Sequence, residues 1–157
     1  MDQIIKNGTV YIAPNATVVG DVVLENNVNI WYGAVLRGDC GQIHVGENTN
    51  IQDNCVLHDP VTIGKGCTIG HAALVHGCTI GDHSMIGMGA IVLSGAQIGS
   101  HCIVAAGAFV KENMVVPDGH LVMGVPARVI GPVRQELIDD IHENELEYLH
   151  LSKKRFG

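Results

Sequence analysis

The sequence predicts an all-β protein, a parallel β-helix of hexapeptide repeats that ends in one α-helix. Three observations support this prediction. An aliphatic residue recurs every six positions, glycine is frequent (20 of 157 residues), and the spacing becomes helical near the C-terminus. A six-residue period fits neither the 3.6-residue period of a helix nor the two-residue period of a strand. It is typical of a β-helix in which each hexapeptide supplies one short strand and a turn.

The aliphatic positions form three runs, separated by two changes of register. The spacing gains three residues through "RGDCGQIHV" and loses one through "HGCT". Small side chains, among them Cys55, Cys67 and Cys102, come four residues after many of these positions, and we expect them to point inward at corners. Three hexapeptides would close one coil, so residues eighteen apart should stack in neighbouring coils. The runs are Ile12, Val18, Leu24, Ile30 and Leu36; Val45, Ile51, Leu57, Ile63, Ile69 and Val75; and Ile80, Ile86, Val92, Ile98, Val104, Val110, Val116 and Val122.

The hexapeptide pattern ends near residue 131, and helical spacing follows it. We therefore expect a β-helix domain over residues 1–131 and a C-terminal helix over residues 132–157 that packs along it. Pro132 suits the first position of a helix. The apolar residues expected on one helical face are Val133, Leu137, Ile138, Ile141, Tyr148 and Leu149.

Composition narrows the class of partner and compartment. The net charge is −7 and only nine residues are Lys or Arg, so we expect no nucleic-acid partner. No apolar run approaches about 18 residues, so we expect no membrane span. The first ten residues show no signal-peptide pattern. Five cysteines without CxxC spacing fit reduced thiols, and we expect a cytoplasmic protein.

The repeat converts sequence spacing into alignment of polar residues. His58 and His76 each follow an aliphatic position by one and lie eighteen residues apart, so they should stack. Arg37 joins them once the three-residue slip is subtracted, and we call Arg37, His58 and His76 the first column. His71 follows its aliphatic position by two, and Asp53 lies eighteen residues before it. Asp53 and His71 form a second column near another corner.

Three histidines in this arrangement indicate a metal site, although a single chain keeps the two columns apart. In a cyclic trimer, the first column of one subunit would face the second column of the next. His58 and His76 would then meet the partner subunit's His71. Three neutral imidazoles and a water form the ligand set of a catalytic zinc site. Alternatively, these histidines are polar turn residues, which is how we interpret His83 and His101.

Several motifs together resemble the γ-class carbonic anhydrases and their close relatives among hexapeptide-repeat proteins. The resemblance implies a left-handed β-helix homotrimer with interfacial metal sites whose ligands are His58, His71 and His76. It implies one divalent metal per site, zinc first, with iron or cobalt as alternatives. The hexapeptide repeat itself and "GVPAR" are shared with many acyltransferases. The specific motifs are "LRGD" (36–39), "NIQD" (50–53), "VLH" (56–58), "IGH" (69–71), "VHGC" (75–78) and the ending "YLHLSKKR".

The resemblance also implies roles for residues around the metal. Gln52 would hydrogen-bond the metal-bound water, and Asn50 and Asp53 would support it, as residues around metal ligands commonly do. Tyr148 would reach the site from the C-terminal helix. As an alternative, Tyr148 is a core aromatic residue on the apolar face of that helix.

Two features depart from the active members of this family. The resemblance implies that Arg37 and Asp39 form an ion pair at the subunit interface, but the glutamate that follows this motif in active members is replaced by Cys40. The acidic loop that those members carry between the first two ligands is also missing. We interpret Asp59, which precedes a proline there, as a turn residue.

The function implied is reversible hydration of CO₂ to bicarbonate by hydroxide that the metal generates from water. Without the relay glutamates, turnover would be slow, would depend on buffer, or would be absent. One rival hypothesis is acyl chemistry, as an acyltransferase or thioesterase. Another is a non-catalytic, metal-stabilised assembly protein.

Overall fold

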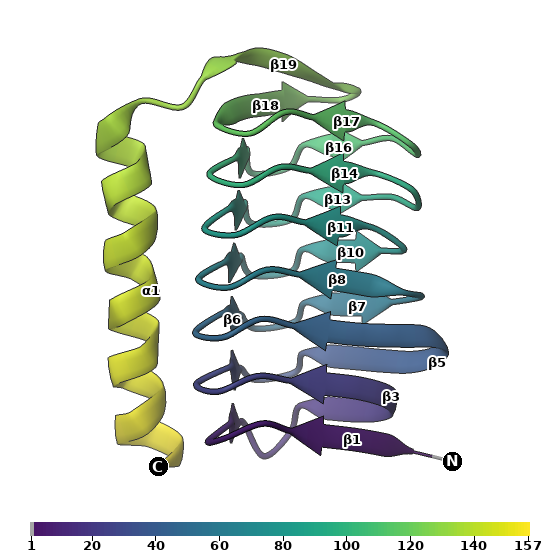
Figure 1. The fold of residues 1–157 in the computed structure, drawn as a ribbon, viewed down its shortest axis with the longest axis vertical. Helices are drawn as coiled ribbons and strands as arrows, with labels where there is room; N and C mark the ends of the chain where they lie inside the picture. Colours follow the sequence, from purple (N-terminus) through teal and green to yellow (C-terminus); the bar gives the residue numbers. More distant parts are fainter. Residues whose placement is uncertain (1) are drawn as a thin grey trace.

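The computed structural model describes residues 2–157 and consists of a parallel β-solenoid of about seven turns with a single C-terminal helix (Figure 1). Strands of successive turns pair in parallel, as the sequence predicted. Val75 lies beside Leu57 in one such pair, and Ile80 lies beside Ile63 in another. The predicted fold class is thus confirmed, because the hexapeptide period places equivalent residues of neighbouring turns in register.

Each turn has three sides, and one side forms a sheet of its own. This sheet ends in an antiparallel pair, in which the chain folds back before the helix begins. Its strands, in chain order, are β2 (Tyr11–Ile12), β4 (Asn29–Ile30), β6 (Asn50–Ile51), β9 (Thr68–Ile69), β12 (Met85–Ile86), β15 (Ile103–Val104), β18 (His120–Gly124) and β19 (Ala127–Pro132).

The other two sides are joined into one sheet, because β3 (Thr17–Leu24) and β5 (Val35–Val45) continue around a corner. The first part of β5 pairs with β7 (Val56–His58) and its last part with β8 (Val61–Ile63). The remaining strands on one of these sides are β7 (Val56–His58), β10 (Leu74–His76), β13 (Ile91–Val92) and β16 (Phe109–Val110). Those on the other side are β1 (Gln3–Lys6), β8 (Val61–Ile63), β11 (Thr79–Ile80), β14 (Gln97–Ile98) and β17 (Val115–Val116).

The three-residue slip in the sequence is accommodated at the corner within β5. Gly20 of β3 pairs with Gly38 of β5, but Val22 pairs with Ile43. Two steps along β3 therefore match five along β5, which leaves three extra residues at this corner. The extra length includes the exposed residues Asp39 and Cys40, while strand pairing resumes on the next side.

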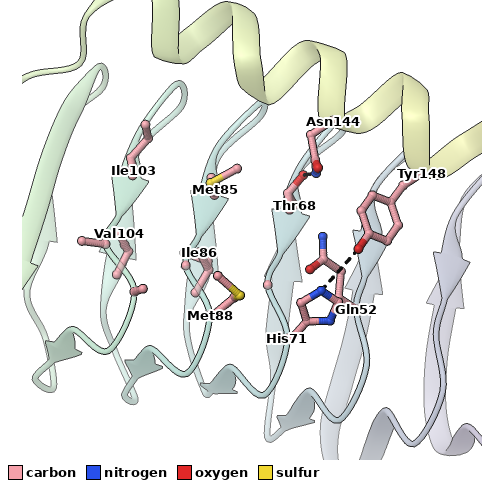
Figure 2. Close-up of a pocket in the computed structure, with 14 residues that line it drawn as sticks. Gln52, Thr68, His71, Met85, Ile86, Met88, Ile103, Val104, Asn144 and Tyr148 are labelled. Atoms are coloured by element: carbon pink, nitrogen blue, oxygen red, sulfur yellow. Dashed lines mark hydrogen bonds between the residues drawn. The ribbon is translucent and has the colours of Figure 1, made fainter.

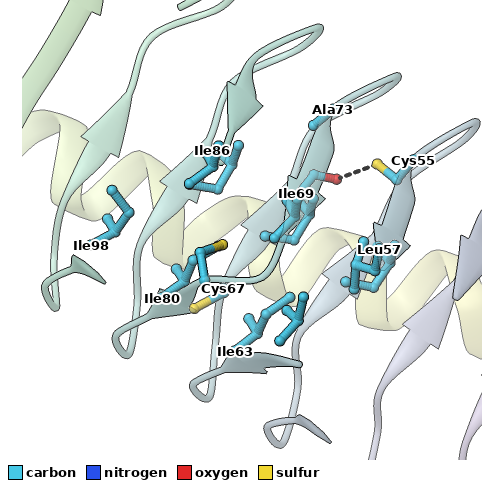
Figure 3. Packing of buried hydrophobic residues seen from close by; sticks show 14 of the residues in the cluster. Cys55, Leu57, Ile63, Cys67, Ile69, Ala73, Ile80, Ile86 and Ile98 are labelled. Atoms are coloured by element: carbon cyan, nitrogen blue, oxygen red, sulfur yellow. Dashed lines mark hydrogen bonds between the residues drawn. The ribbon is translucent and has the colours of Figure 1, made fainter. Parts of the chain in front are cut away.

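The interior of the solenoid holds the aliphatic positions that the sequence predicted. All are buried except Ile12 and Val18 in the first turn, which are half-buried. Burial of each Leu or Ile side chain contributes about 1.5–3 kcal/mol. Cys55 and Cys67 lie among them as predicted (Figure 3). Burial raises the pKa of both thiols to about 12, so they stay protonated.

The helix α1 (Gln135–Phe156) lies along the side formed by β2, β4, β6 and β9 (Figure 1). It begins later than predicted. Pro132 is the last residue of β19, and Arg134 is the N-cap, because the chain first returns antiparallel to β18. No helix in residues 2–157 is long and apolar enough to cross a membrane. Of the predicted face, Val133 and Ile141 are buried and Leu137, Ile138, Tyr148 and Leu149 are half-buried.

Candidate metal centre

The first column is present as predicted. Arg37, His58 and His76 occupy matching positions in three adjacent strands, β5, β7 and β10. His58 Nδ1 and His76 Nε2 lie 3.3 Å apart. The two imidazoles are partly buried, with side chains 17% and 32% exposed. Two ring nitrogens at this separation would share one proton in a hydrogen bond, or would both bind one cation.

A carboxylate orients His58. Asp39 Oδ1 lies 3.0 Å from His58 Nε2, and Arg37 Nη1 donates to Asp39 Oδ2 at 2.8 Å. The hydrogen bond from Arg37, and after it that from His58, lowers the pKa of Asp39 to about 2. At neutral pH this carboxylate can only accept, so His58 donates through Nε2. His58 Nδ1 then faces His76 Nε2.

Ser94 supports His76, a contact that was not predicted from the sequence. Ser94 Oγ lies 2.9 Å from His76 Nδ1. Ser94 follows His76 by eighteen residues, so the period could have indicated it. However, the chain loses one residue at the corner after His76, so Val75 pairs with Val92, seventeen residues later, and not with Leu93.

The second column is also present as predicted. Asp53 Oδ2 lies 2.9 Å from His71 Nδ1. Tyr148 of α1 reaches the same imidazole, with its hydroxyl 3.4 Å from His71 Nε2 (Figure 2). The His71 side chain is 44% exposed. It is thus positioned by two partners while remaining open to solvent.

Tyr148 combines the two interpretations that the sequence left open. Its ring packs edge-on against Trp31, with centroids 5.3 Å apart, and its hydroxyl points to His71 (Figure 2). Burial raises the pKa of the Tyr148 phenol, and the charge of Asp53 adds to this effect. The hydroxyl therefore stays protonated at neutral pH and can donate a hydrogen bond.

A chain of buried amides lies beside His71. Gln52 Nε2 donates to Asn50 Oδ1 at 3.1 Å, and Asn50 Nδ2 donates to Thr68 Oγ1 at 3.0 Å. Asn144 of α1 donates to the same hydroxyl oxygen at 2.9 Å. Because Gln52 is 95% buried and its amide nitrogen is engaged, its carbonyl oxygen is left to accept from a group in the adjacent cavity. Thr68 and Asn144 were not predicted from the sequence.

A cavity of about 350 Å³ adjoins His71 and Gln52 and extends along the solenoid beside α1 (Figure 2). Its wall is polar at the His71 end, where Tyr148 and Asn144 also contribute. Farther along the solenoid the wall is apolar, and it is formed by Met85, Ile86, Met88, Ile103 and Val104. The cavity is therefore larger and more apolar than a site for a small polar molecule requires.

The donor chemistry of the three histidines fits a divalent metal. In each ring one nitrogen contacts an oxygen, supplied by Asp39, Ser94 or Asp53. The other nitrogen contacts the neighbouring imidazole in His58 and His76, and the Tyr148 hydroxyl in His71. Metal-binding histidines are commonly oriented in this way. Within residues 2–157, however, His71 joins no cluster of donor atoms with His58 and His76. One chain therefore brings together only His58 and His76 of the three histidines.

Two further residues lie close to His58. Asp59 has a positive φ of 64° and forms the turn before Pro60, as interpreted from the sequence, but its carboxylate also faces the histidine pair. Asp39, Cys40 and His58 bring three donor atoms within 4.8 Å of one another. Desolvation first, and the negative charge of Asp39 second, raise the pKa of the Cys40 thiol. Cys40 is therefore neutral near pH 7.

The fold and the site define a hexapeptide-repeat solenoid with a histidine-rich candidate metal centre. The family model described as "Bacterial transferase hexapeptide (six repeats)" matches residues 42–77 and 77–112. In a solved structure, a hexapeptide transferase family protein from Anaplasma phagocytophilum is 40% identical, with a TM-score of 0.93 over 96% of this chain and 92% of that chain.

Curated relatives narrow this class. The probable carbonic anhydrase of Methanocaldococcus jannaschii is 47% identical, over 92% of this chain and 93% of its own length. Gamma carbonic anhydrase 2 of Arabidopsis thaliana, a mitochondrial protein, is 41% identical over 92% of this chain, which spans 55% of that protein's length. The chain belongs to the γ-carbonic anhydrase-like family of hexapeptide-repeat proteins.

Proposed function

We propose that the protein is a homotrimeric metalloenzyme that hydrates CO₂ reversibly to bicarbonate. The observation that carries this proposal is that each of the three imidazoles has one nitrogen held by an oxygen of Asp39, Ser94 or Asp53. The second nitrogen contacts the other imidazole or the Tyr148 hydroxyl and would exchange that contact for the metal. His58 and His76 of one subunit and the partner subunit's His71 would hold one divalent metal, zinc first, with iron or cobalt as alternatives. A bound divalent metal would lower the pKa of a coordinated water toward neutrality, which supplies the nucleophile.

Residues of this chain would orient the reacting groups. The Gln52 carbonyl oxygen would accept a hydrogen bond from the nucleophilic water, since Asn50 already engages the Gln52 amide nitrogen. Asp53 would keep His71 in one orientation. The Arg37–Asp39 ion pair, half-exposed in one chain, would lie at the interface between subunits. There it would orient His58 as well as contribute to assembly.

Proton release is the step for which this chain is least equipped. Cys40 stands where active members of the family carry a glutamate. Its raised pKa keeps the thiol protonated at neutral pH, so it cannot accept a proton. We therefore expect turnover to depend on a small buffer molecule that takes the proton. The rate at saturating CO₂ should rise with imidazole buffer concentration at constant pH.

Stopped-flow CO₂ hydration by the trimer, reconstituted with zinc or anaerobically with iron, tests this function. A panel of acyl-CoA hydrolysis assays runs beside it, and His71→Ala is the matched inactive control. We expect CO₂ hydration that His71→Ala abolishes. Hydrolysis of thioesters alone would overturn the proposal. Stoichiometric metal without turnover on either substrate class would instead favour the metal-stabilised assembly protein.

One observation favours acyl chemistry as a second candidate function. The cavity of about 350 Å³ beside His71 is apolar over most of its length, and CO₂ would fill little of it. An acyl chain lying between Met85 and Met88 would place its thioester near His71. Met88→Trp, which fills this cavity, should reduce thioester hydrolysis and leave CO₂ hydration unchanged.

A further inference from the structure

The corner that follows His58 differs from the equivalent corner one turn later. His58 is aligned with His76, and Thr62 is aligned with Thr79. Three residues connect the first pair of positions and only two connect the second. Both corners bend at the residue that follows the histidine, with a left-handed φ of 64° at Asp59 and 62° at Gly77, but only Asp59 has a side chain. This bend directs the Asp59 carboxylate back toward the first column.

The Asp59 carboxylate contacts both histidines of that column. Asp59 Oδ2 lies 3.5 Å from His76 Nε2, and Asp59 Oδ1 lies 3.9 Å from His58 Nδ1. One donor atom from each residue lies within 4.8 Å of the other two. Over the described part of the chain, residues 2–157, no Lys or Arg lies within 4.0 Å of this carboxylate. Its negative charge is therefore balanced by no fixed cation, although it is 31% exposed.

These three donors form a recognised ligand set. Two imidazoles and one carboxylate at one side of a metal are typical of iron(II) sites that keep open coordination positions. We propose that Asp59 is a metal ligand, so that His58, Asp59 and His76 of one subunit hold a divalent cation even without the partner subunit's His71. This inference rests on the proposed metalloenzyme function and assigns that site a fourth protein ligand.

The additional carboxylate has consequences for metal choice and assembly. A set of three imidazoles, one carboxylate and water exceeds the four positions of tetrahedral zinc. It suits metals that accept five or six ligands, so this inference places iron(II) or cobalt(II) ahead of zinc, which the proposed function puts first. Each subunit would also arrive at the trimer with its metal already bound in the first column.

The test is titration of the metal-free protein with Co²⁺, followed by its visible absorption. Asp59→Asn removes the charge and weakens the donor while keeping a residue that tolerates positive φ. We expect at least tenfold weaker Co²⁺ binding and an altered absorption spectrum. Asp82→Asn is the matched control, because Asp82 accepts from the Lys65 backbone N–H at another corner. It should bind Co²⁺ like the wild type.

His71→Ala and the double variant with Asp59→Asn separate the capture site from the complete site. His71→Ala should retain about one Co²⁺ per chain at reduced affinity, and the double variant should lose it. Wild-type affinity and spectrum in Asp59→Asn would overturn this inference and leave the proposed function standing, as would equal weakening in Asp82→Asn. Loss of all binding in His71→Ala would also overturn the inference alone. A wild-type chain that binds no Co²⁺ would overturn both proposals.

Discussion

The two columns of polar residues have similar chemistry but different completeness. In the first, His58 and His76 meet each other, and an ion pair and a serine hold them. In the second, a single imidazole, His71, is held by Asp53 and by a tyrosine from the helix. In every ring of both columns one nitrogen contacts an oxygen, but only the first column contains two rings. In the proposed trimer, the second column would supply the third imidazole of a site shared between subunits.

This difference shows how a solenoid separates neighbours in sequence. His71 and His76 are five residues apart, but a corner lies between them. His58 and His76 are eighteen residues apart and lie side by side in paired strands. In the proposed trimer, a second subunit would bring His71 to the histidines that the corner separates from it.

The largest effect is expected when the intact first column and the intact second column lie on different chains. His58→Ala trimers should retain no tight metal binding, and His71→Ala trimers should lose wild-type affinity. When the two chains are mixed equally and refolded, random assembly should restore about one quarter of the sites. Native mass spectrometry with metal titration measures this fraction. Mixed trimers without any restored site would show that the columns serve separate sites.

Supports of the two columns should differ in effect. Asp53→Asn replaces the charged acceptor of His71, whereas Ser94→Ala removes a neutral partner of His76. Loss of a supporting residue commonly costs about 10–100-fold in metal affinity, and we expect Asp53→Asn to lie in this range. Ser94→Ala should cost less, because hydrogen bonds to charged groups are stronger. Equal losses in metal titrations would contradict this ranking.

A proton acceptor beside the first column should increase the rate of CO₂ hydration. Cys40→Glu adds a carboxylate near His58, and we expect about tenfold faster CO₂ hydration at low buffer concentration. The gain should disappear at high imidazole concentration. Cys40→Gln, of similar size, is the matched control. A gain of equal size in that control would argue against proton transfer.

The smallest effect is expected at Tyr148. Tyr148→Phe keeps the ring against Trp31 and removes the hydroxyl near His71. Metal affinity should change by less than about threefold and stability by about 1 kcal/mol or less. Thermal melts and Co²⁺ titrations measure both. A loss of metal affinity above tenfold would make Tyr148 an essential part of the second column.

Alignment could be predicted from the sequence where the hexapeptide period is unbroken. No slip occurs between His58 and His76, so counting residues was sufficient, and Arg37 required only one correction. The contact between Ser94 and His76 was not predicted, because the corner after His76 is one residue shorter and shifts the register. The direction of Asp59 depends on a backbone angle that spacing does not encode. Pro132 was misplaced because the antiparallel return of β19 is not part of the repeat. The trimer remains a prediction.

The widened corner in β5 shows where this architecture can gain new parts. Three additional residues lie at the corner between Gly38 and Ile43. The parts of β5 on either side of this corner keep their pairing with the preceding and the following turn. Turns contact mainly their immediate neighbours, so a change of length at a corner stays local. The length and sequence of a corner can therefore change, while strand pairing preserves the alignment of the histidines.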